Sequence, residues 1–80
     1  MKVNLLAFGI AKEIIGHRFQ TWEINPGANV SDLRVMLARQ YPLMQNLATL
    51  RFAVNNEYAT EDLLLQENDE VALIPPVSGG

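Results

Sequence analysis

The chain has 80 residues, of which 49% are hydrophobic and 19% charged, and its formal net charge is −3. This length and composition predict one small globular domain with a single core, and they exclude a disordered chain. The absence of cysteine excludes disulfides, thiolate metal sites and a cysteine nucleophile, and the apolar run at residues 3–8 is too short to span a membrane, so we expect a cytoplasmic protein.

Two strands with a short connection between them are predicted first. Residues 3–8 are apolar and are typical of a strand. Residues 10–15 form a turn or short helix that Gly16 caps. Residues 19–24 are rich in aromatic and β-branched side chains and end at the turn signal of residues 25–27 (Asn-Pro-Gly), which predicts a second strand. The simplest pairing of the two strands is a hairpin.

One amphipathic helix follows this hairpin. Asn29 is a favourable N-cap, and Asp32 three residues later makes a variant of the capping box. Pro42 marks the end of the helix. The apolar side chains recur at helical spacing and are assigned to the core: Val30, Leu33, Met36, Leu37 and Tyr41.

The C-terminal half of the chain predicts further strands. Residues 50–55 alternate as in a half-buried strand, and the side chains expected to point inward are Leu50, Phe52 and Val54. Asn55 and Asn56 open a turn, and residues 63–65 (Leu-Leu-Leu) form a short strand or a helical turn. A turn at Asn68-Asp69 then leads into a last strand at residues 70–74.

The resulting order of elements is β-β-α-β-(β)-β. A single amphipathic helix must lie across one face of a mixed sheet, and a strand after the helix can return beside the first strand. This arrangement predicts the α+β class and the ubiquitin-like β-grasp fold. We expect the β-grasp domain to span residues 1–75 and a flexible, extended tail to span residues 76–80.

The sequence ends in Pro75-Pro76-Val77-Ser78-Gly79-Gly80. Prolines cannot continue a sheet ladder, and glycines pass through narrow spaces because they lack side chains. The pattern favours a tail that enters another protein's active site with its terminal carboxylate leading. An ordinary frayed terminus is the alternative.

Two segments carry a resemblance to a known family. The ending Val-Ala-Leu-Ile-Pro-Pro-Val-Ser-Gly-Gly (71–80) and the opening Leu-Leu-Ala-Phe-Gly-Ile-Ala-Lys-Glu-Ile (5–14) resemble the ubiquitin-like sulfur carriers. The resemblance covers essentially the whole chain. The Pro-Pro-Val-Ser-Gly-Gly ending favours the molybdopterin synthase small-subunit branch over the thiazole-synthesis carriers.

The resemblance implies a chemistry centred on Gly80. A ubiquitin-activating-type adenylyltransferase uses ATP to adenylate the Gly80 carboxylate, and a sulfur donor enzyme converts it to a thiocarboxylate. The tail then inserts into the large subunit of molybdopterin synthase and donates sulfur to cyclic pyranopterin monophosphate, which builds the dithiolene of the molybdenum cofactor. Gly79 would accompany Gly80 in the reaction, and the inserted tail would comprise Pro75, Pro76, Val77 and Ser78.

The resemblance also implies the assembly. Two small subunits are expected at opposite ends of a large-subunit dimer, which gives a heterotetramer. No side-chain nucleophile or base is evident, so we expect the chain to be non-catalytic alone and to bind no cofactor or metal itself.

Strand alternation predicts a second, outward face of the sheet. If alternate residues of the first and last strands point to the helix, the outward ones are Leu6, Phe8, Ala72 and Ile74. By resemblance, Phe8, Tyr58 and Ile74 correspond to the apolar patch through which the family binds its partners, although Tyr58 stands where an aliphatic residue is expected. A second small core is the alternative interpretation, but an exposed apolar patch across all three would indicate a docking site.

Charge is unevenly distributed along the chain. All six basic residues lie within the first 51 positions, whereas residues 57–70 hold six acids and no base. An acidic end next to the tail disfavours nucleic acid and suits a basic protein surface, and a solvated face kept for solubility is the alternative.

Other candidate sites are weak. His17 has no carboxylate or cysteine pattern around it, and Trp22 is assigned to packing. The acids at 61, 62, 67, 69 and 70 lack calcium-loop spacing and are interpreted as solvated turn residues. A different carrier role, in thiazole synthesis or tRNA thiolation, and a ubiquitin-like protein modifier remain open alternatives.

Overall fold

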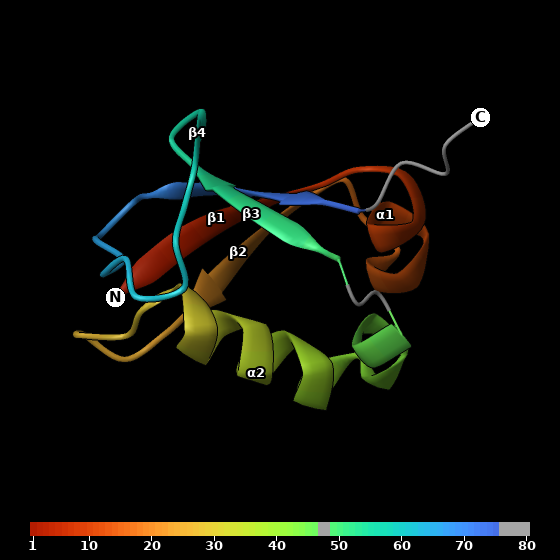
Figure 1. The fold of residues 1–80 in the computed structure, drawn as a ribbon, viewed down its shortest axis with the longest axis horizontal. Coiled ribbons are helices and arrows are strands. Elements are labelled where there is room, and N and C mark those ends of the chain that lie inside the picture. Colours follow the sequence, from red (N-terminus) through yellow and green to blue (C-terminus); the bar gives the residue numbers. More distant parts are fainter. Residues whose placement is uncertain (47–48, 76–80) are drawn as a thin grey trace.

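A mixed sheet with one long helix across one face organises the chain (Figure 1). The structure is a computed structural model that describes residues 1–46 and 49–75. Within these residues the elements in chain order are β1 (Lys2–Ala7), α1 (Gly9–Ile15), β2 (Phe19–Glu23), α2 (Val30–Gln40), the 3-10 helix η1 (Pro42–Asn46), β3 (Arg51–Val54), β4 (Glu57–Tyr58) and β5 (Glu70–Ile74). This is the predicted β-grasp architecture.

The strand order across the sheet is β2-β1-β5-β3-β4. β1 and β2 pair antiparallel, as predicted for a hairpin. β5 lies parallel to β1 on one side and antiparallel to β3 on the other. The last strand therefore occupies the centre of the sheet, and the tail continues directly from this central strand.

The two helices end where the sequence predicts. Gly16 caps α1 in the left-handed conformation, with a φ of 88°, which glycine adopts at no steric cost. At the start of α2, the Asn29 side chain accepts from the Asp32 backbone N–H at 2.8 Å, and the Asp32 carboxylate accepts from the Asn29 N–H at 3.0 Å. The predicted capping box is confirmed, and α2 ends two residues before Pro42.

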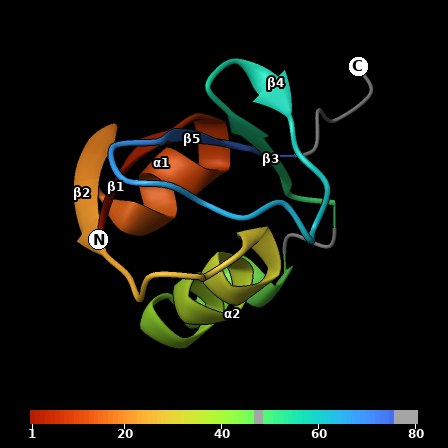
Figure 2. The same ribbon diagram turned by 90° about the vertical axis from the view of Figure 1, so that its left-hand side faces the viewer.

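The core lies between α2 and the facing side of the sheet (Figure 2). The inward alternation is confirmed in both central strands, where the buried residues are Val3, Leu5, Ala7, Val71 and Leu73. From α2, Val30, Leu33 and Leu37 are buried, while Met36 and Tyr41 are half-buried against them. Ala53 alternates with the inward side chains of β3 and is nevertheless buried; it pairs with Ala72 on one side and with Tyr58 on the other.

The fourth strand is not where the sequence placed it. Asn55 and Asn56 both have positive φ, 51° and 72°, which is the geometry of a two-residue hairpin turn. This turn brings Glu57 and Tyr58 back against β3 as β4. The expectation of a strand or helical turn at 63–65 is wrong, because this segment runs along the start of α2 and makes only an isolated bridge from Leu64 to Asn29.

Two smaller features also differ from expectation. η1 occupies a stretch that was expected to be a loop, and β1 begins and ends one residue earlier than predicted. Among the described residues, no helix is long and apolar enough to cross a membrane.

Candidate docking face and tail root

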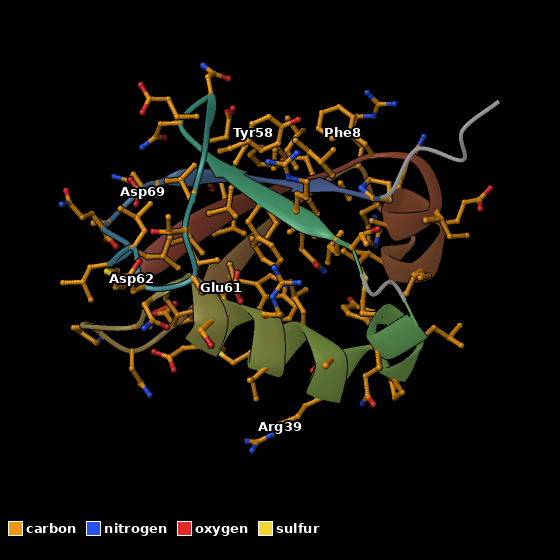
Figure 3. All side chains as sticks on the ribbon, viewed as in Figure 1. Phe8, Arg39, Tyr58, Glu61, Asp62 and Asp69 are labelled. Carbon is orange, nitrogen blue, oxygen red and sulfur yellow. The ribbon has the colours of Figure 1, made fainter. Side chains whose placement is uncertain are left out.

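The face of the sheet opposite α2 carries an apolar groove. Figure 3 shows Phe8 and Tyr58 on this side of the sheet, away from the helix. We call this surface the outer face, and its groove is lined by Leu6, Phe8, Ala53, Asn56, Tyr58, Glu70, Ala72 and Ile74. The structure thus brings the three predicted interface residues, Phe8, Tyr58 and Ile74, together in one groove.

The local structure explains why these side chains remain on the outer face. In β5, burial alternates between Val71 and Leu73, which are buried, and Ala72 and Ile74, which are only half-buried. The Asn55-Asn56 turn sets the register in which Tyr58 pairs with Ala53, and Tyr58 is 61% exposed. An apolar groove with an exposed aromatic ring suits docking onto another protein, although the role of these residues stays a prediction.

The root of the tail lies at the edge of this face. Ile74 ends β5, and Pro75 is the last described residue. Gly9 lies against it, since a Cβ placed on Gly9 would come within 3.2 Å of the Pro75 Cγ, and Gly9 has a φ of 53°. The other predicted tail residues, Pro76, Val77, Ser78, Gly79 and Gly80, lie outside the described residues, so their roles also stay predictions.

Two arginines flank the tail root, and sequence reasoning missed them. The Arg18 guanidinium lies 5.7 Å from the ring centroid of Phe8, and the Arg51 guanidinium lies 4.0 Å from that of Tyr58. Arg51 is also directly opposite Ile74 in the β3–β5 ladder. Their position depends on the pairing of the strands, because β2 and β3 begin at the same end of the sheet at which β1 and β5 end.

The acidic residues are at the other end of the sheet. The expectation of an acidic end next to the tail is wrong, because β5 carries the chain over about 13 Å between Glu70 and Ile74. Figure 3 shows Asp69 at the end of the sheet where β5 begins, with Asp62 and Glu61 below it toward the start of α2. Near the tail root, Lys12, Arg18 and Arg51 outnumber the one acid, Glu13 on α1, so its surroundings are basic on balance.

Two of the acids hold loops in place. The Glu61 carboxylate accepts from the Arg34 Nε and Nη2 at 2.8 and 2.9 Å. This hydrogen bonding to the Arg34 guanidinium lowers the pKa of the Glu61 carboxyl below its usual range. Asp69 accepts from the Asn55 side-chain amide at 2.9 Å and from the Gln66 N–H at 2.7 Å. The interpretation of these acids as turn residues is confirmed for Glu61 and Asp69.

The remaining candidates are possible metal ligands, His17 and Trp22. Within residues 1–46 and 49–75, no group of three or more His, Asp or Glu side chains could hold a metal ion. His17 is exposed. Trp22 is half-buried and packs against Tyr41 with 6.3 Å between ring centroids, which confirms its assignment to packing.

The fold and the outer face together define a class: a ubiquitin-like β-grasp domain whose central strand, the last before the C-terminal Gly-Gly sequence, ends beside an apolar groove. The chain belongs to the ThiS family, whose model matches residues 5–80. Similar curated proteins are named molybdopterin synthase sulfur carrier subunit. The protein of this name from Chlamydomonas reinhardtii is 36% identical, with all of both chains covered. The one from Mycobacterium tuberculosis is 35% identical, with 100% of this chain and 99% of the relative covered.

Solved structures agree with this assignment. SAMP1 from Haloferax volcanii superposes with a TM-score of 0.85 at 25% identity, covering all of both chains. A complex of subunits 1 and 2 of molybdopterin-converting factor from Helicobacter pylori contains a chain that superposes with a TM-score of 0.70 at 26% identity, again over both full lengths.

Proposed function

We propose that this chain is the sulfur-carrier subunit of molybdopterin synthase. The observation that carries the proposal is the similarity to carriers of this name over the whole length of the chain, through Gly80. The outer face supports it, since a carrier that is charged by one protein and discharged by another needs a surface for docking beside its reactive end.

The reacting group in this proposal is the Gly80 carboxylate. Its oxygen attacks the α-phosphorus of ATP on the activating partner, pyrophosphate leaves, and an acyl-adenylate forms. A sulfur nucleophile at the oxidation level of sulfide, supplied by the sulfur donor enzyme, attacks the carbonyl carbon, and AMP leaves. The thiocarboxylate then transfers its sulfur to cyclic pyranopterin monophosphate in the large subunit, and water restores the carboxylate.

The tail residues suit a reaction in which this chain supplies the carboxylate and its partners supply the catalytic groups. Gly79 and Gly80 have no side chains, so a partner can close around the tail and align the carbonyl with the attacking atom. The charges that stabilise phosphate and adenylate must come from the partners. The chain binds no cofactor of its own, and ATP is used by the adenylyltransferase.

The partners in this proposal are three proteins of the cytoplasm. They are the large synthase subunit, a ubiquitin-activating-type adenylyltransferase and a sulfur donor enzyme. The Helicobacter pylori complex of two subunits supports the first of these. Two copies of the chain bound to a large-subunit dimer would form the heterotetramer.

The test is reconstitution with the purified adenylyltransferase, ATP and sulfide, followed by intact-mass spectrometry. We expect one oxygen to be replaced by sulfur at Gly80, and the charged carrier to convert cyclic pyranopterin monophosphate when the large subunit is added. Deleting Gly80, or adding an alanine after it, should abolish charging while thermal unfolding is unchanged. Charging that survives either change would refute the proposal.

The open alternatives predict different outcomes. A protein modifier would form isopeptide bonds between Gly80 and lysines of other proteins in cell extract. A thiazole or tRNA-thiolation carrier would be charged normally but would not transfer sulfur to the pterin with the large subunit present.

A further inference from the structure

The outer face has a charge pattern of its own. Arg18 and Arg51 stand on either side of β5 where it ends, each over an aromatic ring of the groove. Glu70 lines the same groove at the opposite end of β5. The face is therefore basic at the tail root, apolar at its centre and acidic at its far end.

The two guanidiniums have no carboxylate partner in the described part of the chain. The one ion pair within residues 1–46 and 49–75 joins Arg34 to Glu61, on the α2 side of the sheet. A guanidinium stacked on a ring keeps the N–H groups in its plane available, and stacking reduces the freedom it would lose on binding. Arg51, at 4.0 Å, is thus held in position by its ring, whereas Arg18, at 5.7 Å, is held more loosely. Within the described residues, neither guanidinium has its donors used by an acidic side chain.

We propose that Arg18 and Arg51 recognise carboxylates on the large synthase subunit, placed on both sides of the channel that takes the tail. The inference rests on the proposed function, because it assigns the partner that covers the outer face. The basic tail root fits an acidic rim on the partner. The sequence instead predicts that an acidic end of this chain docks on a basic partner surface. Planar guanidiniums match carboxylates with two parallel hydrogen bonds, so they would also fix the orientation of docking.

The substrate of the partner explains why carboxylates would be needed around the channel. A channel that binds an anionic pterin phosphate carries positive charge, and that charge would repel Arg18 and Arg51 at close approach. Carboxylates at the mouth of the channel would offset the repulsion and attract the tail-root end of the carrier. The acidic end around Asp69 would be repelled by the same rim, so a carrier docked the wrong way round is disfavoured.

The test measures binding of full-length carrier variants to the purified large subunit by calorimetry at low and high salt. The charge reversal R18E/R51E should weaken binding at least about tenfold at low salt, and the difference should shrink at high salt. R18K/R51K keeps the charges but loses the planar donors and their contact with the rings, so its loss of affinity should lie between that of the control and that of R18E/R51E. The control for reversing a single charge elsewhere on the surface is R39E, because Arg39 is exposed on α2 and points away from the sheet (Figure 3). It should bind within about twofold of wild type.

The outcomes separate the two proposals. If wild-type carrier does not bind the large subunit, both proposals fall. If wild type binds, Y58A weakens binding and R18E/R51E stays within twofold, the proposed function survives and the arginine proposal is overturned. A loss in R18E/R51E that is as large at high salt as at low salt would also overturn it, as would an equal loss in R39E. Circular dichroism of each variant checks that the fold is retained.

Discussion

Tyr58 shows how a single side chain can be exposed and yet well positioned. Its backbone is fixed by pairing with Ala53, and its ring lies under the Arg51 guanidinium. The ring contributes little to the core, since 61% of the residue is accessible to solvent. A residue in this position can be changed with little effect on folding, which makes it a clean probe of docking.

We predict that Y58A lowers the affinity for the large subunit about tenfold or more, because aromatic residues at the centre of an interface often dominate binding. Its free energy of unfolding should change by no more than about 0.5 kcal/mol. Calorimetric titration and urea denaturation measure the two quantities. L43A is the matched control, since Leu43 is also 61% exposed but lies on η1. Equal loss of affinity in both variants would contradict the assignment of the outer face.

Gly9 is the second informative residue, because its φ of 53° disfavours a side chain and a Cβ there would come within 3.2 Å of the Pro75 Cγ, tighter than an ordinary contact. G9A should lower the free energy of unfolding by about 1 kcal/mol or more and displace the tail root. G16A is the control, since Gly16 has a φ of 88° but nothing within 4 Å of its Cβ position.

Both glycine variants should therefore lose stability in urea denaturation, and only G9A should also slow charging of Gly80 once the fraction folded is taken into account. Equal charging rates would show that the contact of Gly9 with Pro75 does not affect the tail.

At the scale of elements, the connection from β4 to β5 is fastened to the start of α2. The Ser31 N–H donates to the Glu61 carbonyl at 2.9 Å, and the Val30 N–H donates to the Leu63 carbonyl at 3.1 Å. The Arg34–Glu61 pair adds a side-chain link, and the Arg34 guanidinium also lies 4.6 Å from the ring centroid of Phe52. This connection has no strand of its own and is held by the helix instead.

The Arg34–Glu61 link predicts a pH dependence of stability. Because the pKa of Glu61 is lowered in the folded state, the pair stabilises the fold above the pKa of an unfolded glutamate, about 4.3, and this contribution is lost as pH falls through the folded pKa. E61Q should therefore be less stable than wild type at pH 7, and the difference should shrink in acid. Thermal unfolding across this range tests it. Glu13, exposed on α1, gives the control E13Q, which should show a smaller difference at pH 7.

How far the sequence predicted these elements depended on how local their determinants are. The capping box of α2, the Gly16 cap and the alternation of β5 are set by neighbouring residues, and all were predicted correctly. β4 depends on the left-handed conformations of Asn55 and Asn56, so the turn could be predicted but not the pairing that followed it. Phe8, Tyr58 and Ile74 were found by resemblance and alternation. Predicting that Arg18 and Arg51 lie near the tail root required the strand order, which brings the starts of β2 and β3 to that place.

At the scale of the whole molecule, the last strand completes the sheet. β5 pairs with β1 and with β3, so it joins the N-terminal hairpin to the β3–β4 hairpin. Its inward side chains, Val71 and Leu73, are fully buried. The fold therefore depends on residues that stand at the very end of the sequence, just before the tail.

This dependence predicts that truncation has a sharp threshold. A chain ending at Asp69 should lack cooperative unfolding, because both halves of the sheet lose their common neighbour. A chain ending at Pro75 should unfold cooperatively with a stability close to that of the full chain. Circular dichroism melts and amide dispersion in NMR spectra distinguish the two states. A cooperative transition in the shorter chain would show that β5 is dispensable for the core.

The central position of β5 also has a mechanical consequence. Because β1 and β5 are parallel, the N-terminal end of β1 and the tail root lie at opposite ends of the sheet. Their hydrogen bonds run across the strands, so tension between the N-terminus and the tail loads the ladder in shear, and many bonds must break together. Pulling on the tail would likewise have to slide β5 past β3. A partner that pulls on the segment after β5 would therefore load the hydrogen bonds of β5 in shear and would not separate the strands one bond at a time.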